Sequence, residues 1–284
     1  MKNYHVNLLD LYIQKNAKFL VQDEEYYYLY KHFTLDTEMK TLGIFHNNNL
    51  RYSYPSDFND PYDCLCSIEL DFSEFQKESF EKFAKIKINS SIWIQRKNEL
   101  LIAVKKQFNS ATYMEGLRKF IRVTCFNNAP LNILMWSHYA NHHKGFMLEF
   151  RFKKSDGIEQ LPIPVFYQEN LPKQSIPWNM NNLQQDNEIM TESIIKQFLT
   201  KSLDWSYENE FRQISDSGEF KEFSPSSLSS VVLGTKINKE NQEAIRNAVD
   251  DFNQKNSQEV NVYQASTLQD KFKLHVEQHP RLSH

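Results

Sequence analysis

The fold is decided by a stretch in the middle of the chain, Leu131-Asn132-Ile133-Leu134-Met135-Trp136-Ser137-His138-Tyr139-Ala140-Asn141-His142-His143-Lys144-Gly145-Phe146-Met147-Leu148-Glu149-Phe150-Arg151-Phe152. Residues 131–145 predict a short helix, because apolar side chains recur on one side at a period of 3.6 residues. Lys144 in the last turn and Gly145 after it favour an end to the helix there. Residues 146–152 then alternate apolar and polar side chains and predict a strand. A helix, a glycine stop and a strand therefore form one unit.

The predicted helix also carries polar side chains that packing alone does not require. His138 and Lys144 lie near Trp136 and Tyr139, whose rings are able to stack on a base or a sugar. Each residue taken singly also fits a packing role, since a histidine on a Leu/Met face or a lone tryptophan is a normal core residue. Taken together, the four residues form the first part of a candidate site.

A second candidate stretch is Trp205 to Arg212, which we interpret as extended backbone. In a strand, Glu208, Glu210 and Arg212 share one face, and the two carboxylates stand roughly 6.6 Å apart. Arg212 is expected to hold one carboxylate in a forked ion pair and to lower the pKa of both, which leaves the other for chemistry. A solvated Glu/Arg face of a strand is the alternative.

Length and composition predict a folded globular protein, built as one large domain or as two unequal ones. The chain has 284 residues, of which 40% are hydrophobic and 14% aromatic, enough to bury a sizeable core. We expect an α+β fold with a mixed, twisted sheet of about seven strands and helices packed on it. A helical insertion is predicted over residues 72–118 and a long exposed loop over 168–188, within a single domain covering residues 1–284.

Charge and cysteine content narrow the class of protein. The net charge of -3 gives no global basic field for duplex nucleic acid or an anionic membrane, although it is compatible with a local basic patch. Three cysteines are an odd number that suits a reducing cytosol, and Cys64-Leu65-Cys66 lacks the spacing of a zinc knuckle. No apolar run approaches the ~20 residues of a membrane helix. A soluble, cytoplasmic protein without a membrane partner is expected.

The segment from Pro55 to Asp63 predicts a loop, because its proline, asparagine and aspartate residues favour turns. Asp57, Asp60 and Asp63 are able to converge on a divalent cation, which takes carboxylate oxygens as ligands. Their spacing does not match a calcium-binding loop, and turn building is the alternative role.

Several short motifs occur in one order along the chain, and they are Tyr30-Lys31, Phe58-Asn59-Asp60-Pro61-Tyr62-Asp63, Cys125-Phe126, Met135-Trp136-Ser137-His138-Tyr139-Ala140, Lys144-Gly145, Trp205, Tyr207-Glu208, Glu210, Arg212 and Val232-Leu233-Gly234. In this order the chain resembles a widespread bacterial domain-of-unknown-function family over about residues 26–276. The resemblance implies an accessory bacterial protein and leaves its biochemistry open.

A second resemblance bears on chemistry. Tyr30-Lys31-His32-Phe33-Thr34, the strand with Arg51 and Ser53, and Glu208-Asn209-Glu210 are similar to the three-part layout of ADP-ribosyltransferases. That layout implies that the first motif holds NAD, the second supports the nicotinamide pocket and a late glutamate stabilises the ribose cation. Cleavage of the glycosidic bond gives oxocarbenium character, which a preorganised carboxylate stabilises.

Three functions follow as hypotheses. The first is an NAD-consuming or ADP-ribosyl-transferring effector, a toxin or phage-defence protein, that modifies an unidentified nucleic acid or protein. Its catalytic residues are Glu208, Glu210 and His138, and the residues that hold the nucleotide are Tyr30, Lys31, His32, Asn59, Asp60, Trp136, Tyr139, Lys144 and Arg212.

The second hypothesis is a metal-dependent nuclease or phosphodiesterase with Asp60, Asp63, Glu208 and His138 around a divalent cation. The third is a non-enzymatic module that binds a ligand or partner through Trp136, Tyr139 and Trp205. For a joint site, the Asn59-Asp60 loop, the Trp136 helix and the Glu208 strand are expected to face one cleft.

Overall fold

The computed structural model describes residues 3–179 and 197–283. The chain divides into two compact units. Unit 1 comprises Met1–Ser53, Arg122–Val165 and Asp204–His284, and unit 2 comprises Tyr54–Ile121 and Phe166–Leu203. The prediction of a single domain over residues 1–284 stays a prediction beside this division.

Unit 1 contains a mixed, open sheet. Its strands, in spatial order, are β15 (Leu274–Val276), β14 (Asn261–Thr267), β13 (Leu228–Leu233), β6 (Phe146–Lys153), β2 (Tyr26–Phe33), β5 (Arg122–Asn127), β11 (Glu210–Ser215) and β7 (Ile163–Pro164), and β1 (Val21–Gln22) pairs with β2. β13 and β14 run parallel, whereas the other neighbours in this sheet are antiparallel. The predicted α+β class with a mixed sheet is confirmed.

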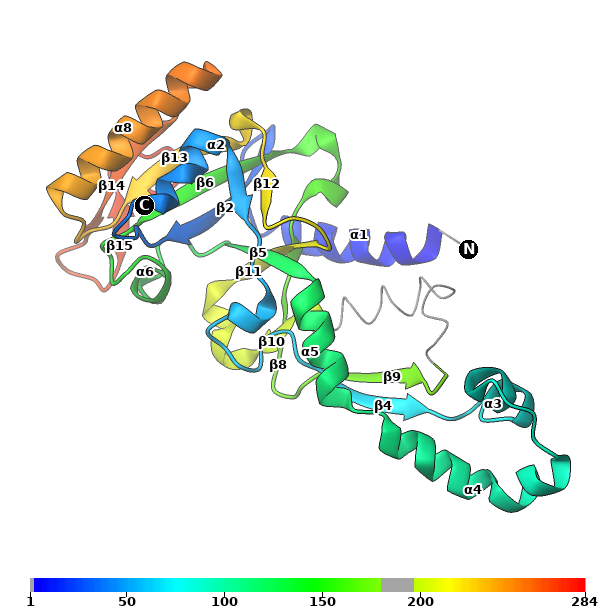
Figure 1. Ribbon diagram of the computed structural model, residues 1–284. Helices are drawn as coiled ribbons and strands as arrows, with labels where there is room; N and C mark the ends of the chain where they lie inside the picture. The colour runs from blue at the N-terminus through cyan, green and yellow to red at the C-terminus, as the bar shows by residue number, and fades with distance from the viewer. Residues whose placement is uncertain (1–2, 180–196, 284) are drawn as a thin grey trace. The chain divides into compact units, whose positions relative to one another are not determined.

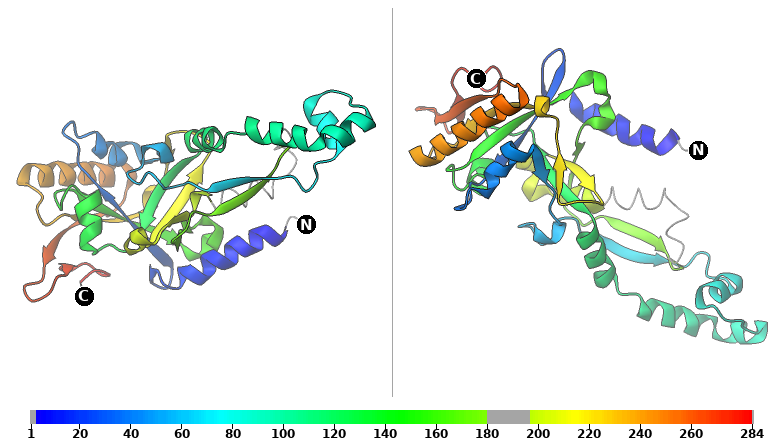
Figure 2. Two further views of the ribbon diagram at one scale, coloured as in Figure 1. Left: turned by 90° about the horizontal axis from the view of Figure 1, so that it is seen from below. Right: turned by 45° about the horizontal axis from the view of Figure 1, so that its top comes forward.

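Alternation along β2 and β6 sends apolar side chains to both faces of this sheet. On one face, Leu29, Leu148 and Phe150 join the larger hydrophobic cluster. Helix α8 (Lys239–Asn256) buries its apolar stripe in this cluster, and α2 (Gly43–Asn47) lies beside α8 (Figures 1 and 2). Helix α1 (Asn3–Ala17) contributes Ile13 and Ala17 to the same cluster.

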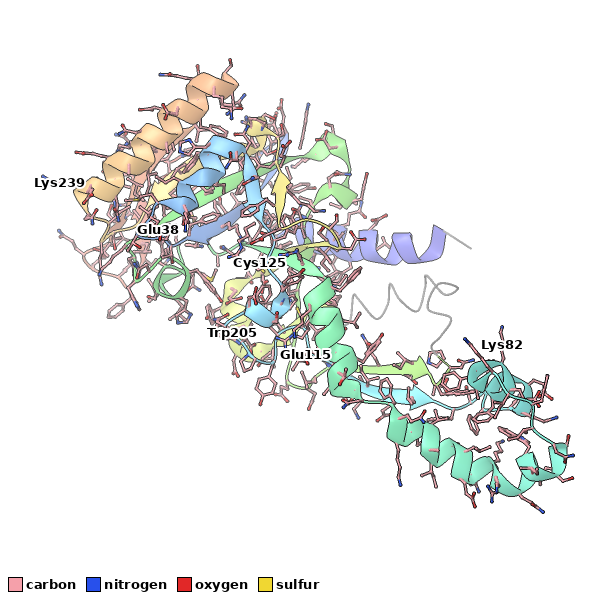
Figure 3. The ribbon with its side chains drawn as sticks, in the orientation of Figure 1. Glu38, Lys82, Glu115, Cys125, Trp205 and Lys239 are labelled. Carbon is pink, nitrogen blue, oxygen red and sulfur yellow. The ribbon has the colours of Figure 1, made fainter. Side chains whose placement is uncertain are left out.

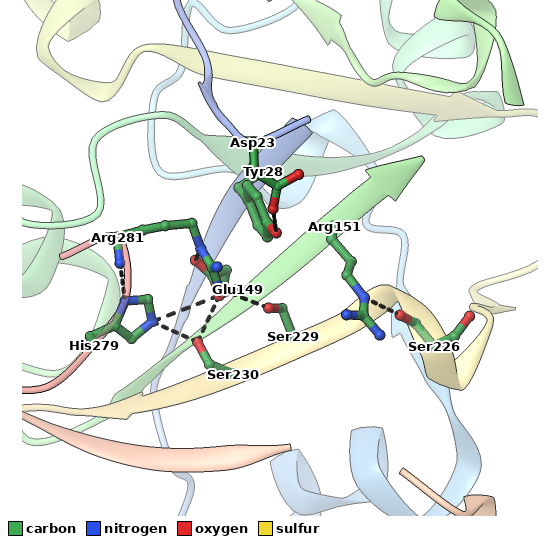
Figure 4. A network of polar contacts seen from close by, with 9 residues as sticks. All are labelled: Asp23, Tyr28, Glu149, Arg151, Ser226, Ser229, Ser230, His279 and Arg281. Atoms are coloured by element: carbon green, nitrogen blue, oxygen red, sulfur yellow. Dashed lines mark hydrogen bonds and ion pairs between the residues drawn. The ribbon is translucent and has the colours of Figure 1, made fainter. Parts of the chain in front are cut away.

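The opposite face of the sheet is covered by α6 (Ile133–Tyr139), whose Trp136 packs with Tyr30 and Met147. This face also holds a buried polar network (Figure 4). The Glu149 carboxylate accepts hydrogen bonds from Arg281 and from the Ser230 hydroxyl, and His279 lies 3.0 Å from that hydroxyl. The segment after β15 is thereby fixed to the middle of the sheet.

β2 and β5 pair at one position only, Tyr30 with Asn127. Two side chains supplement this short ladder. The Asn127 amide donates to the Tyr30 carbonyl at 2.9 Å, and the Lys31 ammonium donates to the Cys125 carbonyl at 2.8 Å. Side-chain hydrogen bonds thus connect the two strands where backbone pairing stops.

The described residues of unit 2 include two strand pairs and three α-helices. β4 (Ser67–Asp71) runs parallel to β9 (Lys173–Pro177), and β8 (Phe166–Gln168) runs parallel to β10 (Thr200–Ser202). The helices α3 (Lys77–Ala84), α4 (Ser90–Gln107) and α5 (Ser110–Phe120) occupy the segment for which a helical insertion was predicted. Phe75, Phe80, Trp93 and Trp178 form a hydrophobic cluster of their own.

The remaining elements are short, and they are η1 (Lys40–Leu42), β3 (Asn49–Arg51), η2 (Pro55–Asp57), η3 (Lys154–Asp156), η4 (Ile158–Gln160), η6 (Leu203–Glu208), β12 (Phe220–Glu222) and η7 (Pro225–Ser227). β12 pairs with β3. Among the helices of the described residues, none is long and apolar enough to cross a bilayer.

The exposed loop predicted over residues 168–188 is wrong in its first part. Lys173–Pro177 forms strand β9, in which Gln174 and Ile176 are buried. The polar composition of this segment hid the strand, because only every second residue turns inward. Residues 180–188 of the predicted loop lie outside the described residues.

The helix predicted over residues 131–145 ends early, at Tyr139. Asn141, His142 and His143 follow with φ values of 46°, 55° and 69°, in the left-handed region that ends a right-handed helix. Gly145 therefore does not serve as the left-handed stop. It is needed for space instead, because a Cβ atom there would lie 2.0 Å from the Phe33 carbonyl oxygen.

Candidate functional site

The segment before β11 has a different backbone from the one predicted. Leu203–Glu208 forms the 3₁₀ helix η6, Asn209 has a φ of 45°, and β11 begins at Glu210. Glu208 and Glu210 therefore do not share the face of one strand. The reason is the left-handed conformation of Asn209 between them. The Asn209 carbonyl accepts a hydrogen bond from the backbone N–H of Asn128 at 3.0 Å.

The first and second candidate stretches do lie together. The Tyr139 hydroxyl donates to Glu208 Oε1 at 2.5 Å, and the Glu208 side chain is only 2% exposed. The Asn132 amide, whose carbonyl oxygen also caps the start of α6, donates to the Tyr207 carbonyl at 3.2 Å. Helix α6 and η6 are thus joined by side-chain hydrogen bonds, as expected from the predicted pairing of these two stretches.

Three rings gather on the same two elements and form what we call the aromatic cluster, made of His138, Trp205 and Tyr207. Their ring centroids are 6.0 to 6.3 Å apart. His138 Nδ1 shares a hydrogen bond with the Tyr207 hydroxyl at 2.9 Å. Because His138 is exposed and Trp205, which is labelled in Figure 3, is partly exposed, the cluster offers ring surface to a planar ligand.

The forked ion pair predicted for one of the two carboxylates forms at Glu210. Arg212 Nε and Nη2 donate to its two oxygens at 2.7 and 3.1 Å. The Arg212 side chain is 0% exposed, so the pair is a buried, mutually compensated one. Glu210 is therefore fixed as a structural anion at the start of β11.

Glu210 also affects two neighbours across the strands. Burial, followed by the Glu210 carboxylate, raises the pKa of the Cys125 thiol on β5 (Figure 3). Burial lowers the pKa of the Lys31 ammonium, whereas Glu210 acts in the opposite direction. A thiol with a raised pKa stays protonated at neutral pH, so Cys125 is not an activated nucleophile.

Three residues assigned to nucleotide binding lie in the core. Trp136 is fully buried, donates its indole N–H to the Pro130 carbonyl at 2.7 Å and meets the His32 ring edge-on. His32 Nδ1 is 3.1 Å from the Asn127 amide, and burial lowers the pKa of His32 to about 3. Tyr30 is buried beside them. The prediction that Trp136 stacks on a ligand is wrong, because its ring is buried and packs against Tyr30 and Met147 of the sheet.

The other predicted site residues are spread more widely. Lys144 is exposed in the loop that follows α6. Asn59 and Asp60 belong to unit 2, where the Asp60 carboxylate accepts the backbone N–H of Tyr62 at 2.8 Å, as a turn-building side chain does. Asp63 lies 3.6 Å from the Lys201 ammonium in the same unit. Their convergence with α6 and η6 stays a prediction.

Within residues 3–179 and 197–283, no group of three or more His, Cys, Asp or Glu side chains is arranged to hold a metal ion. The metal-dependent alternative with Asp60, Asp63, Glu208 and His138 therefore gains no support from these residues.

Ser137 and His143, two of the polar residues that cluster in this stretch of the sequence, border a basic cavity that was not predicted. The Ser137 hydroxyl lies 3.2 Å from His143 Nε2, and both residues line a cavity with Lys236, Lys271 and Lys273. The Lys271-Phe272-Lys273 triplet is the signal that could have pointed to it, since it places an aromatic ring between two cations.

The comparisons with known proteins concern the same region. The model of a family of proteins of unknown function (DUF2971) matches residues 135–213, which include most of α6, all of β6 and η6, and the first part of β11. No curated protein and no solved structure matches the chain. The segment that holds Tyr139, the aromatic cluster, Glu208 and Arg212 is therefore the part of the chain that is similar to this family of unknown function.

Proposed function

We propose that the protein cleaves the glycosidic bond between nicotinamide and ribose in NAD, as a glycohydrolase or an ADP-ribosyltransferase. The observation that carries the proposal is the hydrogen bond from Tyr139 to Glu208 beside the aromatic cluster. A carboxylate that a phenol holds in place before the reaction is suited to stabilise a developing cation. The neighbouring rings supply surface for nicotinamide or adenine.

Glu208 is the better candidate of the two carboxylates. The charge of Glu210 is already compensated by the Arg212 guanidinium, which binds both of its oxygens. The Glu208 carboxylate accepts a hydrogen bond from Tyr139 on α6, the helix that also carries His138 of the aromatic cluster, so it is positioned beside the rings that would hold the nucleotide. We therefore assign the stabilising role to Glu208 and a structural role to Glu210 and Arg212.

The proposed reaction breaks the bond from ribose C1′ to the nicotinamide nitrogen, and the bonding electrons leave with nicotinamide. The ribose carbon becomes an oxocarbenium ion, which Glu208 stabilises. Water or an acceptor hydroxyl, amine or base nitrogen then attacks C1′ and loses a proton. His138 is exposed on α6 within hydrogen-bond reach of Tyr207, and we assign it to accept that proton. In a bacterium, such an enzyme would act as a toxin or defence effector.

The test is nicotinamide release from NAD by wild-type protein and by Glu208→Gln, with and without DNA, RNA or protein as acceptor. We expect release by the wild type and a loss of roughly 100-fold or more in the variant. Glu243→Gln is the matched control, because Glu243 is exposed on α8, far from the aromatic cluster in sequence. Circular dichroism checks that both variants fold. Absence of release by folded wild type with every acceptor, or full activity in Glu208→Gln, would overturn the proposal.

A second candidate function, a ligand-binding module, is favoured by one observation. A cavity of about 730 Å³ in unit 1, whose lining includes Tyr52, Phe126, Phe150, Arg151 and Gln213, has a size typical of small-molecule sites. It differs from the pocket predicted around Trp136, Tyr139 and Trp205. Isothermal titration with NAD and with smaller aromatic ligands distinguishes the two functions, since a module binds without releasing nicotinamide.

A further inference from the structure

A cavity of about 540 Å³ opens beside the left-handed loop that follows α6. Ser137 and His143 line one side, Thr235 and Lys236 follow β13, and residues 267–273, which connect β14 with β15, complete the wall. The loops are fixed by backbone hydrogen bonds. The Lys236 amide donates to the His143 carbonyl at 2.9 Å, and the Leu268 amide donates to the Lys273 carbonyl at 3.0 Å.

The lining of this cavity is basic in a protein whose net charge is -3. Lys236, Lys271 and Lys273 face one acidic side chain of the lining, Asp270. Within the described part of the chain, none of these three lysines forms an ion pair with an acidic side chain. Three ammonium groups and the hydroxyls of Thr235 and Thr267 are groups that bind phosphate.

Phe272 lies between two of these lysines and is 99% exposed. A fully exposed phenylalanine gains nothing from the core of its own protein, since its ring contributes to stability only when it is removed from water. Its place in the rim of a basic cavity fits a base that stacks on the ring while the phosphates meet the lysines.

We infer that this cavity and Phe272 bind single-stranded nucleic acid. A strand presents phosphates and unstacked bases together, whereas a duplex hides its base faces and is disfavoured by the net charge. An anionic membrane fits less well, because a single apolar side chain contributes only about 2 to 3 kcal/mol and the cavity is concave and polar. Ser137 neighbours His138 on α6, so the strand is bound next to the proposed catalytic helix. Binding does not require NAD cleavage and is measured without NAD.

The experiment is fluorescence anisotropy of a labelled oligothymidylate about 20 nucleotides long, titrated with the full chain at several salt concentrations. We expect Phe272→Ala to weaken binding roughly 10-fold. The double variant Lys271→Gln/Lys273→Gln should also reduce the salt slope of log affinity by about 1. The control is Lys18→Gln/Phe19→Ala, which removes another exposed pair of a lysine and a phenylalanine. The Phe19 ring is 70% exposed, the Lys18 ammonium lies 5.1 Å from its centroid, and neither residue lines this cavity.

Weaker binding in the two test variants and unchanged binding in the control support the inference. No binding by the wild type, or equal binding by Phe272→Ala, overturns it. Competition by thymidine monophosphate at similar affinity also overturns it, because the site would then take a mononucleotide or free phosphate rather than a strand. Binding to anionic vesicles with none to the oligonucleotide would assign the surface to a membrane. All of these results are independent of nicotinamide release.

Discussion

Glu149 on β6 and Arg281, in the segment after β15, form a two-pronged ion pair with contacts of 2.8 and 2.5 Å (Figure 4). The Glu149 side chain is 0% exposed. Although burial alone would raise its pKa, the hydrogen bonds and charge of Arg281 hold the pKa of Glu149 below its ordinary value. The pair also places the Arg281 guanidinium 3.9 Å above the Tyr28 ring, so one side chain contacts two central strands.

Replacing Arg281 by methionine should therefore leave a buried carboxylate without its main partner. We expect the free energy of unfolding, measured by urea denaturation, to fall by about 3 to 5 kcal/mol. The double variant Arg281→Met/Glu149→Gln should recover most of that loss, since the isolated charge is then removed. A loss below about 1 kcal/mol in the single variant would contradict the structural role of the pair.

Stability should fall in mild acid because of His32. In the unfolded chain a histidine binds a proton below pH ~6.5, whereas burial lowers the pKa of His32 in the fold to about 3. Between these values the unfolded state holds the extra proton, so His32 lowers stability by about 1.4 kcal/mol for each pH unit of acidification. His32→Gln, which keeps an acceptor for Asn127, should reduce the slope of stability between pH 6 and pH 4. Phe252→Leu, in the hydrophobic cluster on the other face of the sheet, is the control, which should lower stability equally at each pH.

Gly234 should be intolerant of any side chain. A Cβ atom there would lie 2.2 Å from the His143 carbonyl oxygen, which is a backbone atom and part of a hydrogen-bonded loop. We expect Gly234→Ala to cost roughly 2 kcal/mol or more in thermal or urea unfolding. Gly116→Ala on α5 is the opposite case, because nothing lies within 4 Å of its added Cβ, and should stabilise helix α5 by about 0.5 to 1 kcal/mol.

The left-handed loop predicts different changes in stability when His142, an exposed residue, is replaced by glycine or by valine. His142 has a φ of 55°, which glycine adopts without strain and a β-branched residue adopts poorly. We expect His142→Gly to leave stability unchanged or raise it by up to about 1 kcal/mol, and His142→Val to lower it by about 1 to 2 kcal/mol. The melting temperatures of both variants, measured by differential scanning calorimetry, test this expectation. Equal melting temperatures would argue against a left-handed residue at this position.

Tyr139 should act on the proposed reaction as a positioning residue. Tyr139→Phe removes the hydroxyl that donates to Glu208 and keeps the ring. We expect kcat for nicotinamide release to fall about 10-fold with KM nearly unchanged, since the hydroxyl orients the carboxylate rather than the nucleotide. A rise in KM at constant kcat would place Tyr139 in substrate binding instead.

Strong local patterns made much of the sheet predictable. The alternation of residues 146–152 and the aromatic run before Phe33 both become central strands, and residues 228–233 become β13. The failures come from single backbone conformations that composition does not reveal. Asn141 to His143 and Asn209 adopt positive φ without being glycine, which shortens α6 and separates Glu208 from Glu210.

The segments that meet at the candidate site were predictable from the sequence, whereas the role of each side chain there was harder to predict. The sequence interpretation brought α6 and the Glu208 segment together, and the Tyr139 contact bears this out. It could not tell that Trp136 faces inward while His138 faces solvent, because both orientations fit a short helix with mixed side chains. The approach of Lys236 to Lys271-Phe272-Lys273 was equally hidden, since the two loops are far apart in sequence.

The division of the chain into two units has a consequence for synthesis on the ribosome. The chain passes from one unit to the other after Ser53, Ile121, Val165 and Leu203. The sheet of unit 1 cannot be completed before β11 and β13, which follow the last of these passages, have been made. β2 must wait for β5 and β6, and these strands in turn wait for β11 and β13, so the nascent protein exposes apolar strand edges until the last of these partners is made. Such a chain is a natural substrate for chaperones that cover apolar surface during synthesis.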